Sequence, residues 1–277
     1  KEYDNKDYKQ CRKSCDKILE KNSSNQEALA LKGLSILGLG DKVTAEKLIK
    51  DSIKLGMKNG KVWHFYALFH KELKNYAQTV QFYNMAYKND PENFSLIKDL
   101  SYLLLFLGRY NDFCEYSRIA VTTKSALVVN WVQYSFAEFL LKNYEIALKT
   151  IESVENNAKD TLKKQEYNEI ILYKSKILTK LNKYDKCIEL LENELNEHCT
   201  DKITFYELLT NICIKNNDIN QGIKYCIFAL KNNPENINYY LAYFNLKIKD
   251  LNLNKYEDLF KFDESSTDNE KLYEILL

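Results

Sequence analysis

The sequence contains few residues that bend or interrupt a chain: its 277 residues include 2 prolines and 7 glycines. This scarcity argues against an all-β or collagen-like fold and favours long helices. Long apolar runs are also missing, since Leu103 to Leu107 is among the longest and a membrane-spanning helix needs roughly 18 residues. We therefore expect a soluble, intracellular, all-α protein.

Charge of one sign does not dominate either, because 40 basic side chains are balanced by 39 acidic ones. Catalytic motifs are absent from the sequence: it has no glycine-rich phosphate loop, no His-Glu-x-x-His and no Gly-x-Ser-x-Gly. Its histidines, His64, His70 and His198, have no nucleophile and orienting acid at a recognisable spacing. We predict a non-catalytic chain that uses no cofactor.

The chain has 7 cysteines, an odd number. Cys11, Cys15, Cys187, Cys213 and Cys226 fall at packing positions of predicted helices. A free thiol packs like a small apolar side chain, so we interpret these residues as buried thiols of a protein in a reducing compartment. Cys11 and Cys15 also have the spacing of two metal ligands on one helix, but no second pair lies nearby in the sequence. The sequence therefore predicts no zinc site.

Aromatic landmarks recur along the chain at intervals close to 34 residues. Trp63 and Trp131 lie two such intervals apart, and a tyrosine ends each of several short turns. These turn tyrosines are Tyr8, Tyr76, Tyr110, Tyr144 and Tyr184. Such a period is typical of a solenoid, in which helical hairpins too small to bury their own apolar faces stack on one another. At repeated positions we expect the rings to be core residues, not a ligand cage or a base-stacking platform.

The segment from Gly60 to Glu92 shows one complete repeat. A first helix directs Trp63, Tyr66 and Ala67 inward, Asn75-Tyr76 forms the turn, a second helix directs Tyr83 and Ala86 inward, and Pro91 ends the unit. These residue types and spacings match the tetratricopeptide pattern. Small residues such as Gly33, Ala67 and Ser101 fall where paired helices cross, since larger ones would separate the axes beyond about 8–10 Å. We predict an all-α, right-handed tetratricopeptide-repeat solenoid of antiparallel helix pairs.

We expect a single solenoid domain over residues 1–262, with about seven helix pairs and an incomplete first unit. The unit with Tyr184 comes about six residues late, so Asn156 to Lys164 is predicted to hold a longer loop or an extended helix. Residues 263–277 have the pattern of a polar linker and the start of a further helix. Because the apolar stripe of that helix is cut short and residue 1 is lysine, we expect an excised N-terminal portion of a longer protein.

The register also predicts which first-helix side chains point into the hollow of the superhelix. They form an apolar strip: Leu34, Leu37, His64, Leu68, Tyr102, Leu105, Val132, Phe136, Phe139 and Leu172. The strip is a candidate groove for a segment of a partner or of this protein's missing part. The alternative is a tight curvature that buries it within the solenoid. A groove for acidic chaperone tails is not expected, because Leu34, Leu68 and Tyr102 stand where an amide would be needed.

Positive charge gathers near the N-terminus, where residues 1–61 carry 14 basic and 9 acidic side chains, a net charge of +5. Two lysine rows have helical spacing and avoid the packing positions: Lys6, Lys9, Lys13 and Lys17, then Lys47, Lys50, Lys54 and Lys58. We expect both rows on the outer face, side by side. One interpretation is a salt-dependent contact to the phosphates of ribosomal RNA. The alternative is a solvated face, tempered by acids such as Asp16, Glu46 and Asp51.

Several strings resemble one family more closely than the general repeat does. They are Leu29-Ala30-Leu31-Lys32-Gly33-Leu34 with Leu39-Gly40, Val62-Trp63-His64-Phe65-Tyr66-Ala67-Leu68, Ile97-Lys98-Asp99-Leu100-Ser101, Asn130-Trp131, Asn143-Tyr144-Glu145, Leu172-Tyr173, and Asn233-Pro234-Glu235-Asn236 followed by Tyr239-Tyr240. Over nearly all of residues 3–245 the chain thus resembles the N-terminal repeats of the large auxiliary subunit of the N-terminal acetyltransferase A (NatA) complex. It departs mildly from the family at Ala67, usually Gly, and at Lys98, usually Arg. The region after Leu246 matches poorly.

The resemblance implies a scaffold that is not itself the enzyme. In that family the auxiliary subunit encircles a separate catalytic subunit, directs it toward small N-terminal residues exposed after methionine removal, and anchors the complex near the ribosomal exit tunnel. The implied partners are the catalytic acetyltransferase subunit, mainly through parts missing here, and the ribosome in the cytoplasm, with no membrane and no small-molecule substrate. Consistently, the chain lacks the acetyl-CoA loop Gln/Arg-x-x-Gly-x-Gly/Ala of the catalytic family. The alternative function is a tetratricopeptide protein–protein interaction adaptor of another multiprotein assembly.

Overall fold

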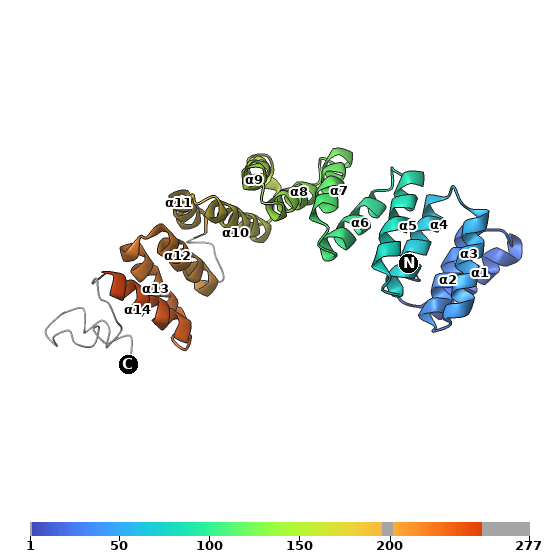
Figure 1. Ribbon diagram of the computed structural model, residues 1–277, viewed down its shortest axis with the longest axis horizontal. Helices are drawn as coiled ribbons and strands as arrows, with labels where there is room; N and C mark the ends of the chain where they lie inside the picture. Colours follow the sequence, from blue (N-terminus) through green and yellow to red (C-terminus); the bar gives the residue numbers. More distant parts are fainter. Residues whose placement is uncertain (1, 196–201, 251–277) are drawn as a thin grey trace. The chain divides into compact units, whose positions relative to one another are not determined.

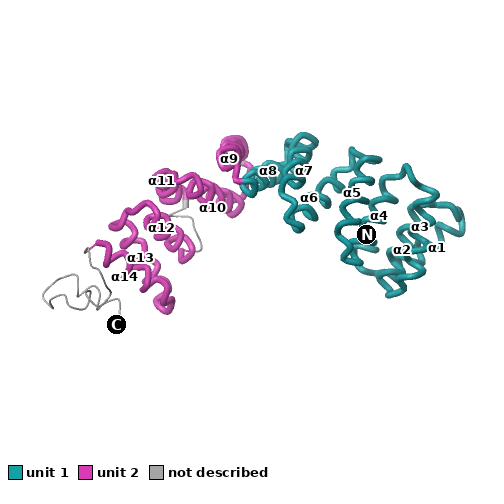
Figure 2. Tube along the Cα trace, viewed as in Figure 1, with its two compact units in different colours: residues 1–141 teal, residues 142–277 magenta. Residues whose placement is uncertain are grey.

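A computed structural model describes residues 2–195 and 202–250, and the regular elements of these residues are all helical (Figure 1). The chain divides into two compact units, residues 1–141 and 142–277, which Figure 2 shows in teal and magenta. The predicted single domain over residues 1–262 stays a prediction. The linker and helix predicted for residues 263–277 lie outside the described residues.

Unit 1 contains the helices α1 (Tyr8–Lys21), α2 (Gln26–Gly38), α3 (Lys42–Leu55), α4 (Gly60–Glu72), α5 (Tyr76–Asn89), α6 (Phe94–Phe106), α7 (Tyr110–Thr123) and α8 (Val128–Leu140). Unit 2 contains α9 (Tyr144–Ala158), the short 3-10 helix η1 (Lys159–Thr161), α10 (Lys164–Lys180), α11 (Tyr184–Leu195), α12 (Lys202–Asn216), α13 (Ile219–Asn232) and α14 (Ile237–Asp250). Consecutive helices pack as hairpins, α2 with α3, α4 with α5 and α6 with α7 in unit 1, and α10 with α11 and α12 with α13 in unit 2. The predicted all-α tetratricopeptide solenoid is confirmed.

A left-handed residue stands two positions before each second helix. Positive φ angles occur at Lys6 (60°), Gly40 (100°), Lys74 (58°), Gly108 (68°), Lys142 (65°), Asn182 (56°) and Asn217 (59°). At one such turn the Lys74 N–H donates to the Lys71 carbonyl and the Asn75 N–H to the His70 carbonyl, both at 2.9 Å. Left-handed backbone costs a non-glycine residue about 1–2 kcal/mol, so the stacked fold must compensate for the lysines and asparagines at these turns.

The second helices bury their fourth and eighth residues throughout the described chain. These buried pairs are Cys11 and Cys15, Ala45 and Ile49, Thr79 and Tyr83, Phe113 and Ser117, Ala147 and Ile151, Cys187 and Leu191, and Gly222 and Cys226. The cysteines among them are free thiols in the core, as predicted, and so is Cys213 of α12. Burial raises the pKa of the Cys15 thiol to about 12, which keeps it protonated and unreactive. Cys199 lies outside the described residues.

Small residues occupy the crossing point on the first helices, again as predicted. The row comprises Gly33, Ala67, Ser101, Ser135, Ser175 and Thr210, all buried. A Cβ atom added to Gly33 would lie 2.6 Å from Cγ1 of Ile49 and 3.1 Å from the carbonyl oxygen of Ala45 on α3. Where the row holds serine, its hydroxyl is satisfied within the helix, as when Ser101 donates to the Ile97 carbonyl at 2.7 Å. These residues are therefore small because the paired helices lie close together at this point, and not because their side chains take part in a reaction.

The two tryptophans use the same contact in different repeats. The Trp63 indole N–H donates to the carbonyl of Met57, and that of Trp131 donates to the carbonyl of Ser125, both at 2.8 Å. Each acceptor lies six residues before its tryptophan, in the loop that leads into the first helix. Trp63 is 9% exposed and stacks on Phe82, whereas Trp131 is only partly buried. The tryptophans thus fasten each loop to the helix that follows it.

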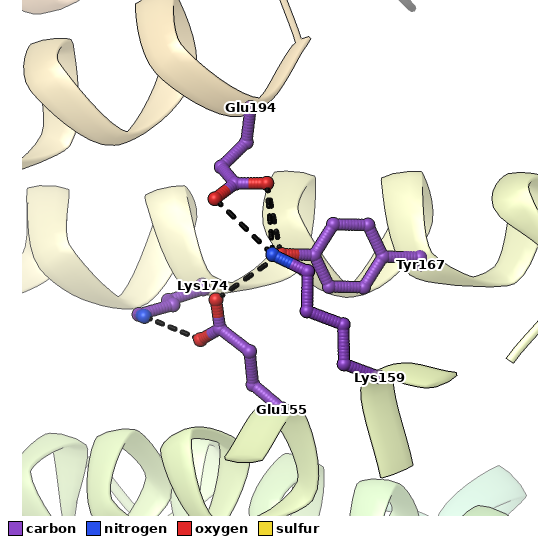
Figure 3. A network of polar contacts seen from close by, with 5 residues as sticks. All are labelled: Glu155, Lys159, Tyr167, Lys174 and Glu194. Carbon is purple, nitrogen blue, oxygen red and sulfur yellow. Dashed lines mark hydrogen bonds and ion pairs between the residues drawn. The ribbon is translucent and has the colours of Figure 1, made fainter. Parts of the chain in front are cut away.

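The six extra residues of unit 2 lengthen its helices and add a short turn. α9 continues to Ala158, η1 follows, and α10 begins at Lys164, so the extended-helix alternative describes this region better than a long loop does. Figure 3 shows a polar network that fastens this insertion. Lys174 of α10 binds Glu155 of α9 at 2.6 Å, with both side chains about 15% exposed.

The Tyr167 hydroxyl connects this ion pair to α11 (Figure 3). Its oxygen lies 3.0 Å from a carboxylate oxygen of Glu194 and 3.3 Å from one of Glu155. A hydroxyl has one proton and donates to one carboxylate at a time. The Lys159 ammonium lies 3.4 Å from Glu194 and 4.8 Å from the centroid of the Tyr167 ring. Two cations and two carboxylates therefore balance at this junction, which joins α9, η1, α10 and α11.

Candidate functional site

The two predicted lysine rows lie on and beside α1 and α3, two helices that both pack against α2. All eight lysines are exposed. Lys50 binds Glu46 at 2.7 Å and Lys54 binds Asp51 at 2.9 Å on their own helix, and the carboxylate of Glu46 raises the pKa of Lys50. The other six have no ion pair or hydrogen bond from their side chains to the residues that the structure describes. Exposed pairs of this kind are weak, so the rows remain available to an external anion.

A shallow cavity of about 680 Å³ opens at the end of the second lysine row. Lys54, Lys58 and Lys61 line it, together with the exposed side chain of Met57. Asp90 is the acidic residue of the lining, and Lys61 itself pairs with Glu27 at 3.4 Å. The cavity was not predicted from the sequence, because it lies where the α3–α4 and α5–α6 loops come together. Its lining suits a small anionic group better than an apolar ligand.

The residues of the predicted apolar strip differ in how far they are exposed to solvent. Leu34 is 1% exposed and packs with Ile49 and Phe69 in the core of unit 1, so a partner cannot reach it. Leu37 and Leu68 are partly buried against the same core, and Leu105 and Leu68 also pack against the cluster around Trp63. His64, Val132, Phe139 and Leu172 are likewise partly buried. Leu172 belongs to unit 2, whereas the other strip residues belong to unit 1.

The strip is most exposed on α6. Tyr102 is 48% exposed, and Phe136 on α8 is 36% exposed. Beside Tyr102 the structure shows an aromatic side chain that was not in the predicted strip: Phe106 is 70% exposed at the end of α6. One and two repeats earlier, its position holds Glu72 and Gly38. One repeat later it holds the partly buried Leu140, so the residue type alone did not predict the exposure of Phe106.

A group of polar residues lies between α4, α5 and α6 and includes His64 of the predicted strip. The His64 Nε2 atom is 3.5 Å from a carboxylate oxygen of Asp99, and the His64 ring is tilted against Tyr83 with the centroids 5.5 Å apart. The Tyr83 hydroxyl is buried and has no hydrogen-bond partner among the described residues. Burial, and then the nearby charge of Asp99, raises the pKa of Tyr83. These groups fasten α4 and α5 to α6 and present no nucleophile with a base.

No group of three or more His, Cys, Asp or Glu side chains among the described residues is placed to hold a metal ion. Nor does any helix between residues 2 and 250, as far as the structure describes them, have the length and apolar character needed to cross a bilayer. The candidate binding regions of the described chain are the lysine rows, the shallow cavity beside them, and the exposed part of the apolar strip.

Solved structures with the same architecture are tetratricopeptide proteins. The C-terminal part of a tetratricopeptide-repeat protein from Cytophaga hutchinsonii superposes with a TM-score of 0.62 at 13% identity, covering 87% of this chain and 96% of that one. A structure of Naa15/Naa10 bound to HypK superposes with a TM-score of 0.73 at 24% identity, covering 91% of this chain and 38% of that one. Together with the repeat register, these likenesses define the class: the chain is a tetratricopeptide-repeat protein.

Sequence comparison finds similar proteins within this class. The N-terminal tetratricopeptide-repeat region of Psidin matches residues 1–122. The auxiliary subunit NAA15 of the N-terminal acetyltransferase A complex from Arabidopsis thaliana is 27% identical over 244 residues, which cover 87% of this chain and 27% of that protein. The NatA auxiliary subunit N-alpha-acetyltransferase 16 from Homo sapiens is 28% identical over 242 residues, covering 86% of this chain and 28% of that protein.

The chain is therefore similar to the NatA auxiliary subunits, in agreement with the resemblance of its sequence strings. It spans little more than a quarter of the length of these two curated relatives. They are named as auxiliary subunits of an acetyltransferase.

Proposed function

We propose that the chain belongs to a non-catalytic scaffold subunit of a NatA-type complex. In this role it supports co-translational N-terminal acetylation by binding a separate catalytic subunit and by contacting the ribosome in the cytoplasm. The observation that carries the proposal is the similarity to curated NatA auxiliary subunits over 86–87% of the chain. The repeat architecture agrees with it, because stacked helical hairpins offer extended surfaces for binding other macromolecules.

The two candidate surfaces suit different partners, one a protein and the other RNA. The open part of the apolar strip, on α6 and α8, offers the partly solvated apolar area that a protein partner buries. The lysine rows and the adjoining cavity offer exposed ammonium groups, six of them in the rows without an ion pair among the described residues, which suit the phosphates of ribosomal RNA. Such contacts depend on salt and carry no sequence preference, as expected for a complex that meets every translating ribosome.

Recovery of the full-length protein from its own cells tests the proposal. An affinity tag on the chromosomal copy avoids overexpression, and mass spectrometry then identifies what co-purifies after a wash at moderate salt. We expect a small acetyltransferase in near-stoichiometric amount, together with ribosomal proteins that are lost when salt is raised. Recovery of a different assembly without any acetyltransferase would instead support the adaptor function.

A further inference from the structure

α6 carries a line of exposed side chains that the core of unit 1 does not use. Lys98, Tyr102 and Phe106 are spaced four residues apart, so they lie along one side of the helix; we refer to them as the α6 stripe. Tyr102 is 48% exposed and Phe106 is 70% exposed. Clustered aromatic exposure of this kind marks interaction sites, whereas scattered single residues do not.

The rings of the α6 stripe are held in place by their neighbours. The Lys98 ammonium lies 5.8 Å from the centroid of the Tyr102 ring, within reach of a cation–π interaction. Phe106 makes an edge contact with Tyr76, with the ring centroids 5.3 Å apart. Rings that are ordered in advance lose little conformational entropy when a partner binds. The α6 stripe is therefore suited to serve as a set of anchors.

The charge around the α6 stripe is positive. Lys71 and Lys74, at the end of α4 and in the following turn, are exposed, as is Lys98. None of these three has an ion pair with a carboxylate in the part of the chain that the structure describes. Among the nearby acids, Asp99 faces His64 and Asp112 of α7 binds Arg109, whereas Glu72 beside Lys71 is exposed, so the three lysines leave a net positive charge.

We propose that the α6 stripe binds an amphipathic helix of a protein partner whose apolar face is flanked by carboxylates. Tyr102 and Phe106 would take its apolar side chains, and Lys71, Lys74 and Lys98 would pair with the flanking carboxylates. A helix is favoured over an added strand, because the described residues contain no strand whose edge could be extended. Single-stranded RNA, whose bases could stack on the same exposed rings, is distinguished by the oligouridine probe in the test below.

This inference rests on the proposed scaffold function and deepens it by naming the chemistry of one partner. Its test uses the purified 277-residue chain and a synthetic probe, so it fails independently of any acetyltransferase or ribosome contact. The probe is a fluorescein-labelled helical peptide of about 18 residues with leucines along one face and glutamates on the other. Three comparison probes are a peptide with lysines replacing the glutamates, a peptide with the same composition but scrambled leucines, and an oligouridine RNA.

Fluorescence anisotropy should show that the acidic amphipathic peptide binds and that the lysine-containing and scrambled peptides do not. Phe106→Ala and Tyr102→Ala should each weaken binding about tenfold, as expected for central aromatic anchors. Lys71→Glu and Lys98→Glu should weaken it and flatten its salt dependence. Ile237→Ala on α14 is the matched control, because Ile237 is 69% exposed and lies in unit 2. Circular dichroism checks that every variant is folded.

Three results would overturn the proposal. They are no binding of the acidic peptide, binding that Phe106→Ala and Tyr102→Ala leave unchanged, and oligouridine binding that these two substitutions abolish.

Discussion

At the scale of single residues, the repeated positions of this chain are occupied for reasons of packing. Trp63 and Trp131 each cover a helix pair and donate one hydrogen bond to a loop carbonyl, both at 2.8 Å. The buried thiols of Cys11 and Cys187 fill a position where other repeats place alanine, threonine, phenylalanine or glycine. These residues were assigned to the core from the repeat register alone, because a core position recurs at a fixed interval whatever apolar side chain fills it.

Truncation of Trp63 to alanine measures how much one such residue contributes. Trp63 is 9% exposed and stacks on Phe82 with the ring centroids 6.0 Å apart, so Trp63→Ala removes a large buried surface. We expect the free energy of unfolding to fall by about 3–5 kcal/mol in urea titrations followed by circular dichroism. Trp131→Ala should lose less, because Trp131 is only partly buried. Equal losses at the two positions, or a loss below about 1 kcal/mol at Trp63, would contradict this assignment.

His70 should make the stability of unit 1 depend on pH. Its ring packs against Tyr66 and Phe69, and both of its nitrogen atoms are buried without a hydrogen-bond partner among the described residues. Burial lowers the pKa of His70 in the folded state below its ordinary value. Between the folded and unfolded pKa values the unfolded chain therefore binds the proton more readily. Stability is then complete above about pH 6.5 and is lost as the pH falls below that value.

The substitution His70→Phe isolates this effect from the other histidines. Phenylalanine keeps the ring packing and removes the titrating group, so the variant should lose less stability than the unsubstituted chain between about pH 7.5 and pH 5.5, about one unit either side of an ordinary histidine pKa. Thermal unfolding at several pH values supplies the comparison. If both proteins lose the same stability on acidification, His70 does not titrate as the structure indicates.

At the scale of helices and turns, the sequence predicted much of what the structure shows. Helix pairing, the turn positions and the buried faces follow from local pattern, because a period of 34 residues repeats the same contacts. Exposure along the first helices does not follow from that pattern. Leu34 and Tyr102 occupy equivalent positions, yet they are 1% and 48% exposed. Their exposure depends on how tightly successive first helices pack, which is set by side chains of the neighbouring repeat.

Gly33 tests the close crossing of α2 and α3. A β-branched side chain there would overlap Ile49 and the Ala45 carbonyl, since even a single Cβ atom lies 2.6 Å and 3.1 Å from them. We expect Gly33→Val to lower the free energy of unfolding by about 1–3 kcal/mol through overpacking. Lys47→Val on the exposed face of α3 controls for the helix propensity of valine and should cost about 0.5 kcal/mol or less. Similar losses in the two variants would mean that α2 and α3 are not closely packed at Gly33.

Charge reversal tests the lysine rows on α1 and α3. The fourfold variant Lys13→Glu, Lys17→Glu, Lys50→Glu and Lys54→Glu changes only exposed side chains, so the fold should be retained. We expect co-sedimentation with ribosomes at low salt to be lost, because phosphate contacts are replaced by repulsion. A matched control reverses four exposed lysines of unit 2: Lys149, Lys176, Lys186 and Lys224. Co-sedimentation that survives in the first variant would leave the rows as a solvated surface.

At the scale of the whole molecule, the chain consists of two compact units, and its candidate binding sites are surface regions. Unit 1 carries the lysine rows, the cavity beside them and the α6 stripe, and unit 2 carries the lengthened helices fastened by Glu155, Lys174 and Tyr167. The similarity to NatA auxiliary subunits gives these surfaces a context that the general repeat pattern does not supply, because one tetratricopeptide fold serves many assemblies. Which partner binds is determined by side chains outside the repeat pattern.

The most direct test of the scaffold function is an acetylation assay with three arms. A peptide that begins with serine is incubated with acetyl-CoA and the full-length protein, with the acetyltransferase subunit from the same cells, or with the two assembled together. We expect no product with the full-length protein alone and faster acetylation by the assembled pair than by the acetyltransferase alone. The scaffold function would be wrong if the full-length protein acetylated the peptide by itself, or if it neither bound the acetyltransferase nor changed the rate of acetylation.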